Sequence, residues 1–252
     1  MLRAKIRKVL PGWLIDWPSQ ALIRLLRQPV RLWAQQKAVG IEALIADADD
    51  ALWQESLTFV SEFSVAANEL LAQSKVKQGG AGALEFLYYA VRKLKPDTVF
   101  ETGVASGWSS AIFLHALELN GSGSLLSSDL PYKNRKGSNE SIGIVVPQHL
   151  THRWRLCCEG DRTCIDSLLE HTTQVDVFHY DSDKTVSGRR FVWSKLESRM
   201  AEDSLVIFDD IQDNWEFRRL VNQNQVCYLI FEYHGKFVGC IFYGNTYQRF
   251  FN

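Results

Sequence analysis

From residue 83 onward the sequence alternates between helix-like segments and short apolar segments, which restricts the fold more than any other feature. The apolar segments have the length and composition of strands and cover residues 97–102, 123–130, 153–161, 175–181, 204–210, 225–233 and 236–244. Helical periodicity between most of them indicates crossover connections, which join parallel strands. Only His234 and Gly235 separate the last two segments, as in a hairpin. We therefore expect an α/β fold with a mostly parallel sheet, helices on both faces and a C-terminal antiparallel hairpin.

Composition excludes several classes of protein. The 252-residue chain has a formal net charge of −1, which gives no argument for a nucleic-acid partner. No apolar run reaches the roughly 18–20 residues of a membrane span, and the basic start lacks the features of a secretory signal. The five cysteines follow no metal-binding spacing, so we expect reduced thiols, no zinc site, and packing roles for Cys157 and Cys158. These features predict a cytoplasmic protein.

The first part of the chain has its own charge pattern. Residues 1–37 carry eight basic side chains and one acidic one, whereas residues 38–72 carry seven acidic and no basic ones. Three glycines near residues 75–82 mark a boundary, so we expect a helical extension over 1–75 and a separate domain over 76–252. The basic helix is either a cap on the domain, a peripheral contact with an anionic membrane, or a self-association surface in a homodimer.

The turn after the first expected strand carries the clearest binding signal. In the sequence ETGVASG, Glu101 ends the strand and Gly103 and Gly107 follow. An acid at this point would repel a pyrophosphate but suits a cationic ammonium or sulfonium group, while the following helix N-terminus, near Ser109, favours a carboxylate. Asp129 ends the next strand and can accept hydrogen bonds from ribose hydroxyls. S-adenosylmethionine carries all of these groups; the alternatives are a tight turn without ligand and a solvent-exposed aspartate.

These residues resemble the class I S-adenosylmethionine-dependent methyltransferases. The run ETGVASGWS is similar to the E-x-G-x-x-x-G-Y-S turn of the catechol O-methyltransferase group, with Trp108 in place of tyrosine. The resemblance covers residues 76–243 and implies a Rossmann-like sheet. It assigns the methionine part of the cofactor to the turn, the ribose to Asp129 and the adenine to the segment after the third strand. The implied cofactor-binding residues are Glu101, Gly103, Ser106, Gly107, Ser109, Asp129, Gly160 and Asp161.

A second set of acidic residues follows two later strands. Asp181, Asp209 and Asp210 end apolar strands that should be neighbours, and three adjacent carboxylates need a positive partner. A hard divalent cation such as Mg²⁺ meets that need, while the alternative is that these aspartates cap the following helices. The catechol-type enzymes carry D-x-x-K and D-N at these strands, and Asp181 with Lys184, and Asp209 with Asp210, resemble that pattern. The D-G-D-H strand of sugar and macrolide O-methyltransferases is similar to residues 181–184.

The resemblance implies methyl transfer from S-adenosylmethionine to a hydroxyl of a small-molecule or sugar acceptor, assisted by Mg²⁺ or another divalent cation. Asp181 and Lys184 are the implied catalytic residues: Lys184 is either the base that takes the acceptor's proton or an ion-pair partner of a neighbouring aspartate. The polar loop at 131–150 is expected to cover the acceptor. The alternatives are a metal-independent N- or O-methyltransferase, a non-methylating hydroxylase-like protein, and a scaffold protein on the same fold.

Overall fold

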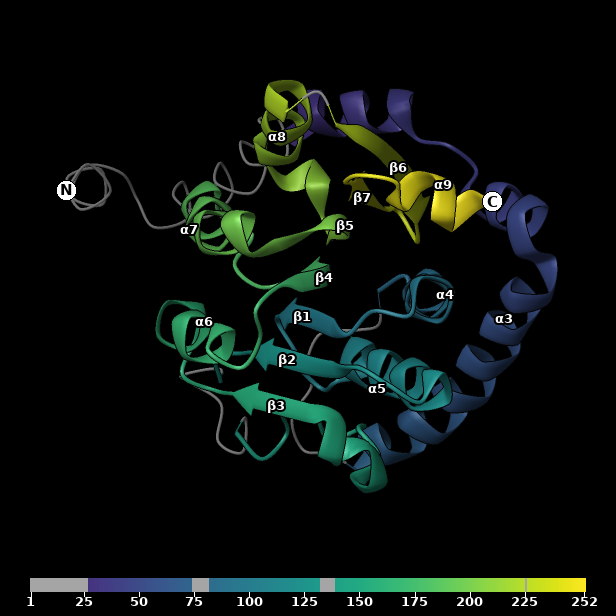
Figure 1. Ribbon diagram of the computed structural model, residues 1–252, viewed down its shortest axis with the longest axis vertical. Helices are drawn as coiled ribbons and strands as arrows, with labels where there is room; N and C mark the ends of the chain where they lie inside the picture. Colours follow the sequence, from purple (N-terminus) through teal and green to yellow (C-terminus); the bar gives the residue numbers. More distant parts are fainter. Residues whose placement is uncertain (1–26, 74–81, 132–138, 225) are drawn as a thin grey trace, which may run out of the picture.

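The computed structural model describes residues 27–73, 82–131, 139–224 and 226–252. Its centre is a seven-stranded sheet in the order β3-β2-β1-β4-β5-β7-β6 (Figure 1). The strands are β1 (Thr98–Thr102), β2 (Ser124–Ser128), β3 (Trp154–Cys157), β4 (Val175–Tyr180), β5 (Met200–Phe208), β6 (Cys227–Tyr233) and β7 (Lys236–Phe242).

Strands β1 to β5 run parallel, and the β6–β7 hairpin joins β5 in the antiparallel direction. The chain moves outward from β1 to β3 and then returns to place β4 on the other side of β1, so the order reverses between β1 and β4. Ligands of open α/β sheets bind beyond the carboxyl ends of the strands at such a reversal. The expected α/β, Rossmann-like architecture with its C-terminal hairpin is confirmed.

Helices cover both faces of the sheet, as alternate residues of each strand require. One face packs against the helices α4 (Leu84–Leu94), α5 (Trp108–Asn120) and α9 (Thr246–Phe251), with α3 (Ile41–Gln73) outside them. The other packs against α6 (Asp161–Leu169), α7 (Val186–Leu196) and α8 (Glu216–Asn224). Short 3-10 turns lie at Gln148–Arg153, Glu197–Arg199 and Ile211–Asp213. Helix α9 was not among the expected elements.

The N-terminal helices of the described chain pack onto the rest of the fold. Residues 27–37 are helical, and Ala34 is fully buried in the core on the α8 face. The chain then passes the edge strand β6, where the Val39 N–H donates to the Ile230 carbonyl at 2.8 Å. This contact covers part of a sheet edge. Helix α3 continues on the opposite face, where Phe59 stacks on Tyr88 with ring centroids 4.8 Å apart.

Some expectations fall on residues outside the described ranges. The proposed boundary at 75–76 lies within residues 74–81, and most of the basic N-terminal segment lies within residues 1–26. Part of the loop expected over the acceptor, residues 132–138, is likewise not described. Among the described residues, no helix has the length and apolar character needed to cross a bilayer.

The expectation that the cysteines are all reduced is wrong. Cys157 and Cys164 form a disulfide, while Cys158, Cys227 and Cys240 are free thiols. The local chain path explains the pair: β3 ends at Cys157, the chain turns at Gly160, whose φ is +86°, and the first turn of α6 returns Cys164 to a Cα–Cα distance of 5.7 Å. Cys157 is therefore a cross-link between β3 and α6 and not simply a packing residue.

Candidate active site

The glycine turn after β1 brings two strands and a distant loop close together. Gly103 has a φ of +86°, and a Cβ at this position would lie 2.6 Å from the Asp181 carbonyl oxygen after β4. Gly107 has a φ of +93°, and a Cβ there would lie 2.7 Å from the Cα of Gly143. Both positions need glycine because of the left-handed backbone and because a neighbouring backbone occupies the space of a side chain.

Glu101 is fully buried beneath this turn. Its carboxylate accepts hydrogen bonds from the hydroxyls of Ser109, Ser110 and Ser127, and the Ser127 distance is 2.9 Å. These bonds tie β1 to β2 and to the start of α5. The described partners of Glu101 are thus these three serines and His179, whose Nδ1 lies 3.8 Å from the carboxylate, and a contact with the ammonium group of a cofactor stays a prediction.

Asp129 lies at the carboxyl end of β2, where backbone amides fix its carboxylate. The Ala105 N–H donates to Oδ2 and the Leu130 N–H donates to Oδ1, both at 2.7 Å. Burial raises the pKa of Asp129, although the two amide donors work in the opposite direction. The carboxylate therefore has a fixed orientation at the side of the glycine turn.

Asp161 connects the segment after β3 with the segment after β4. It begins helix α6 and accepts hydrogen bonds from the hydroxyls of Ser128 and Ser182, each at 2.6 Å. Gly160 precedes it, with its own N–H donating to the Asp129 carbonyl at 2.9 Å. The residues expected at the ribose and adenine are thus linked to one another by hydrogen bonds.

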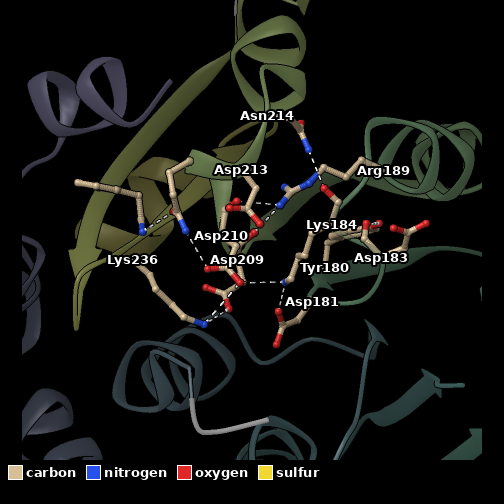
Figure 2. A network of polar contacts seen from close by, with 12 residues as sticks. Tyr180, Asp181, Asp183, Lys184, Arg189, Asp209, Asp210, Asp213, Asn214 and Lys236 are labelled. Atoms are coloured by element: carbon tan, nitrogen blue, oxygen red, sulfur yellow. Dashed lines mark hydrogen bonds and ion pairs between the residues drawn. The ribbon is translucent and has the colours of Figure 1, made fainter. Parts of the chain in front are cut away.

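The second acidic set lies at the ends of β4 and β5 (Figure 2). Asp181, Asp209 and Asp210 each offer a carboxylate oxygen, and these three atoms lie within 4.8 Å of one another. The Lys184 ammonium contacts Asp181 and lies 3.4 Å from Asp210. The alternative that these aspartates cap the following helices finds no support, because the Thr185 side chain caps α7 and no side-chain bond caps the turn after Asp210.

Three residues that the sequence analysis missed complete this cluster. Lys236, at the start of β7, lies 3.5 Å from an Asp210 oxygen and 4.0 Å from an Asp209 oxygen (Figure 2). Gln212 donates to Asp210 at 2.9 Å, and the buried Arg189 donates to the carbonyls of Asp209 and Asp210 at 2.8 and 3.0 Å. They lie in different segments, so no local motif marks them.

The pKa values of the neighbouring Asp209 and Asp210 are shifted in opposite directions. Burial, with the charge of Asp181, raises the pKa of Asp209 to about 6. Burial also disfavours the ionised form of Asp210, but Lys184 and Lys236 outweigh it and lower the pKa of that carboxyl. Because Asp209 is 5% exposed and has only distant cationic partners, it is the carboxylate that would gain most from an additional cation.

One cavity of about 840 Å³ joins the two ends of the site. The predicted site residues that line it are Gly103, Asp129, Gly160, Asp161, Asp181, Lys184 and Asp210. Lys236 and Ile142 also line it. The predicted residues that do not line it are Glu101, Ser106, Gly107, Ser109 and Asp209. These five are buried, in or next to the glycine turn or in the acidic cluster.

The donor set is compatible with a hard divalent cation. Three carboxylate oxygens lie close enough to share one ion, and oxygen ligands are those that Mg²⁺ prefers. The ammonium groups of Lys184 and Lys236 share the same carboxylates, so a cation would compete with them for Asp181 and Asp210. The residues present fit the metal, and they also fit a site in which Lys184 and Lys236 offset two of the three carboxylate charges.

Comparison with known proteins agrees with this geometry. Residues 100–211 match the family model described as a methyltransferase domain. No curated protein matches the sequence significantly.

Solved structures match over about three quarters of this chain or more. The O-methyltransferase from Bacillus cereus, solved with SAH, has a TM-score of 0.52 at 15% identity over 83% of this chain and 99% of its own. A methyltransferase from Geobacter sulfurreducens has a TM-score of 0.55 at 15% identity and covers 72% of this chain and 88% of its own. The O-methyltransferase TomG from Streptomyces achromogenes, solved with SAM, has a TM-score of 0.54 at 14% identity and covers 73% of this chain and 89% of its own. At these identities the structures show a shared fold. The family model covers residues 100–211, and within that range the chain is similar to methyltransferase domains.

Proposed function

We propose that the chain transfers a methyl group from S-adenosylmethionine to a hydroxyl of a small-molecule or sugar acceptor, assisted by Mg²⁺ or another divalent cation. The observation that carries this proposal is the single cavity lined by Asp129 and Gly103 at one end and by Asp181, Lys184 and Asp210 at the other. A methyl donor and a hydroxyl held next to each other in one cavity react as an effectively unimolecular pair.

The proposal assigns the cofactor to the end of the cavity formed by β1, β2 and β3. Asp129 would accept the ribose hydroxyls, because its carboxylate lines the cavity and is held by backbone amides. Gly160 and Asp161 would lie along the adenine, and Gly103 would let the backbone approach the methionine part. Glu101, Ser106, Gly107 and Ser109 would support the turn from behind. Two of the similar structures contain SAM or SAH, which supports this assignment.

The proposal assigns the acceptor to the end formed by β4 and β5. S-adenosylmethionine bound in the cavity would supply an electrophilic methyl group, and a divalent cation on Asp181, Asp209 and Asp210 would lower the pKa of the acceptor hydroxyl. Lys184, between Asp181 and Asp210, is the candidate for removing the hydroxyl proton. Arg189 and Gln212 would orient the two carboxylates of β5 from behind.

A metal-independent methyltransferase is the second candidate, and one observation favours it. The ammonium groups of Lys184 and Lys236 already lie against the acidic cluster, so the carboxylates have positive partners without a metal. In that case the aspartates would bind an amine or hydroxyl acceptor directly. Activity that is equal in Mg²⁺ and in EDTA would distinguish this candidate from the first.

The remaining proposals concern the division into domains, the location of the protein and the role of its N-terminal segment. We retain a helical extension over 1–75 and a cofactor-binding domain over 76–252, in a cytoplasmic protein. Homodimer formation and peripheral membrane contact through the basic N-terminal segment also stay predictions. They rest on the charge pattern of residues 1–37 alone.

The test is methyl transfer from radiolabelled S-adenosylmethionine to a panel of catechols and sugars, in Mg²⁺ and in EDTA. Metal-assisted transfer predicts that EDTA and Asp209→Asn each abolish turnover while S-adenosylmethionine still binds. Lys184→Met should lower kcat by roughly 10²–10⁴-fold, the usual contribution of a general base. Lys195→Gln, on the outer side of α7 and paired with Asp166, is the matched control and should turn over normally. Cofactor binding without transfer to any acceptor would instead favour a hydroxylase-like or scaffold role.

A further inference from the structure

Lys236 differs from Lys184, the other lysine of the cavity, because its ammonium group has only long contacts with the carboxylates described around it. Its side chain lines the cavity and is 52% exposed. Its two carboxylate contacts, 3.5 and 4.0 Å long, are at the outer limit of ion pairing, whereas Lys184 contacts Asp181 directly. An ammonium group held loosely at the open side of a cavity can bind another anion at little cost.

The backbone that carries Lys236 is nevertheless fixed to the site. The next residue, Phe237, donates its N–H at 2.8 Å to Gln212, whose side-chain amide in turn donates to Asp210. On the other side, Arg31 donates to the Gly235 carbonyl at 3.0 Å and lies over the Phe237 ring. The hairpin turn is thus held both by the acidic cluster and by the N-terminal helix. Lys236 has a defined place in the site, unlike an ordinary surface lysine.

The charge balance indicates which kind of acceptor this lysine would suit. The three carboxylates and the ammonium groups of Lys184 and Lys236 sum to a net charge of −1. A divalent cation on the carboxylates would draw Asp210 away from Lys236 and leave the Lys236 ammonium without a close carboxylate. A neutral acceptor would leave this ammonium unpaired, whereas an acceptor carrying a carboxylate would neutralise it.

We propose that Lys236 is a specificity residue that binds an anionic group of the acceptor, so that the site selects vicinal diols bearing a carboxylate. This inference rests on the proposed function, because it needs the acceptor at the β4–β5 end of the cavity. A carboxylate is the group named because it pairs with a single ammonium at the cavity mouth and leaves the diol free for the acidic cluster.

The test is a calorimetric titration with two diols of similar shape, 3,4-dihydroxybenzoate and the neutral 3,4-dihydroxybenzyl alcohol. The full chain is first saturated with S-adenosylhomocysteine in the presence of Mg²⁺. The parent protein should bind the benzoate roughly two- to fivefold more tightly, the range that a half-exposed ion pair contributes. Lys236→Gln should remove this preference, measured as the ratio of the affinities for the benzoate and the alcohol within the same variant. Lys236→Arg should restore most of it, and Lys195→Gln should keep it entirely.

Each contrary outcome has a distinct meaning. Failure of S-adenosylhomocysteine to bind would overturn the proposed function itself. If it binds, equal affinities for the two diols, or a preference that survives in Lys236→Gln, would overturn only the role of Lys236. If the protein binds S-adenosylhomocysteine but neither diol, the proposed class of acidic diol acceptors would be overturned, and the cofactor assignment would stay in place.

Discussion

At the scale of single residues, Gly103 determines how closely the ends of β1 and β4 approach each other in the cavity. Gly103→Ala should destabilise the protein by more than about 2 kcal/mol, because the new methyl group would meet the Asp181 backbone and the left-handed φ would be strained. Gly121→Ala is the matched control: its φ is +77° but no atom of the described residues lies within 4 Å of the new methyl group, so it should cost about 1 kcal/mol. Urea denaturation measures both, and equal losses would contradict the close approach.

Asp209 should make the stability of the metal-free protein depend on pH. Its pKa of about 6 in the folded protein lies above its ordinary value of 3.8. Its contribution to the free energy of unfolding is therefore largest when the carboxyl is protonated in both the folded and the unfolded state, and it falls as the pH rises from 3.8 to about 6. Asp209→Asn removes this dependence. In EDTA, the stability of the variant relative to the parent should therefore increase by about 1–2 kcal/mol between pH 5 and pH 8. Parallel pH profiles in urea denaturation would show that the carboxyl is not perturbed.

Sequence patterns identified some site residues and not others, for a physical reason. Asp181 and Lys184 are three residues apart, and Asp209 and Asp210 end a strand, so local spacing and the strand-end rule were enough to group them. Lys236 reaches the same cluster only through the antiparallel pairing of β7 with β5. The orientation of Glu101 could not be predicted either, because a strand-end position does not specify whether a carboxylate faces a ligand or three serines.

At the scale of elements, the disulfide between β3 and α6 fixes the loop that carries Gly160 and Asp161. Its removal in Cys157→Ser/Cys164→Ser should cost about 2–3 kcal/mol by the loop-closure argument for a seven-residue separation. It should also weaken cofactor binding, because that loop lines the cavity. Cys158→Ser, next to the cross-link, should leave both properties nearly unchanged.

A thiol count checks this cross-link directly. The chain has five cysteines, and the structure leaves three of them free. Titration of the denatured, unreduced protein should therefore find three reactive thiols, and five would contradict the disulfide.

The alternation of strands and helices predicted the elements well because the buried strands are short and continuously apolar. Expected and observed strands coincide from β1 to β7, with differences at their ends. Helix α9 was missed because it has only six residues, too few for a periodic pattern. The disulfide was missed because cysteine spacing alone does not show that a turn at Gly160 brings positions 157 and 164 together.

At the scale of the whole molecule, the helix at 27–37 is part of the packed structure. Val30 and Ala34 are buried, Arg27 pairs with Asp213 at 2.9 Å, and Arg31 holds the hairpin that carries Lys236. A chain that begins at residue 38 should therefore melt about 5–10 °C below one that begins at residue 27, since it loses several kcal/mol of packing. Thermal unfolding of the two truncations measures this difference, and equal melting temperatures would contradict it. The shorter deletion is the suitable variant for testing membrane or partner contact.

We propose that one cavity binds S-adenosylmethionine through Asp129 and keeps the acidic cluster for the metal and the acceptor. The most direct measurement is a calorimetric titration of the purified protein with S-adenosylmethionine, in Mg²⁺ and in EDTA, alongside Asp129→Ala and Asp209→Ala. We expect the parent protein and Asp209→Ala to bind the cofactor in both buffers. Asp129→Ala should lose at least about tenfold in affinity, because it lacks the charged acceptor of the ribose hydroxyls. Absence of binding in every condition, or undiminished binding by Asp129→Ala, would contradict it.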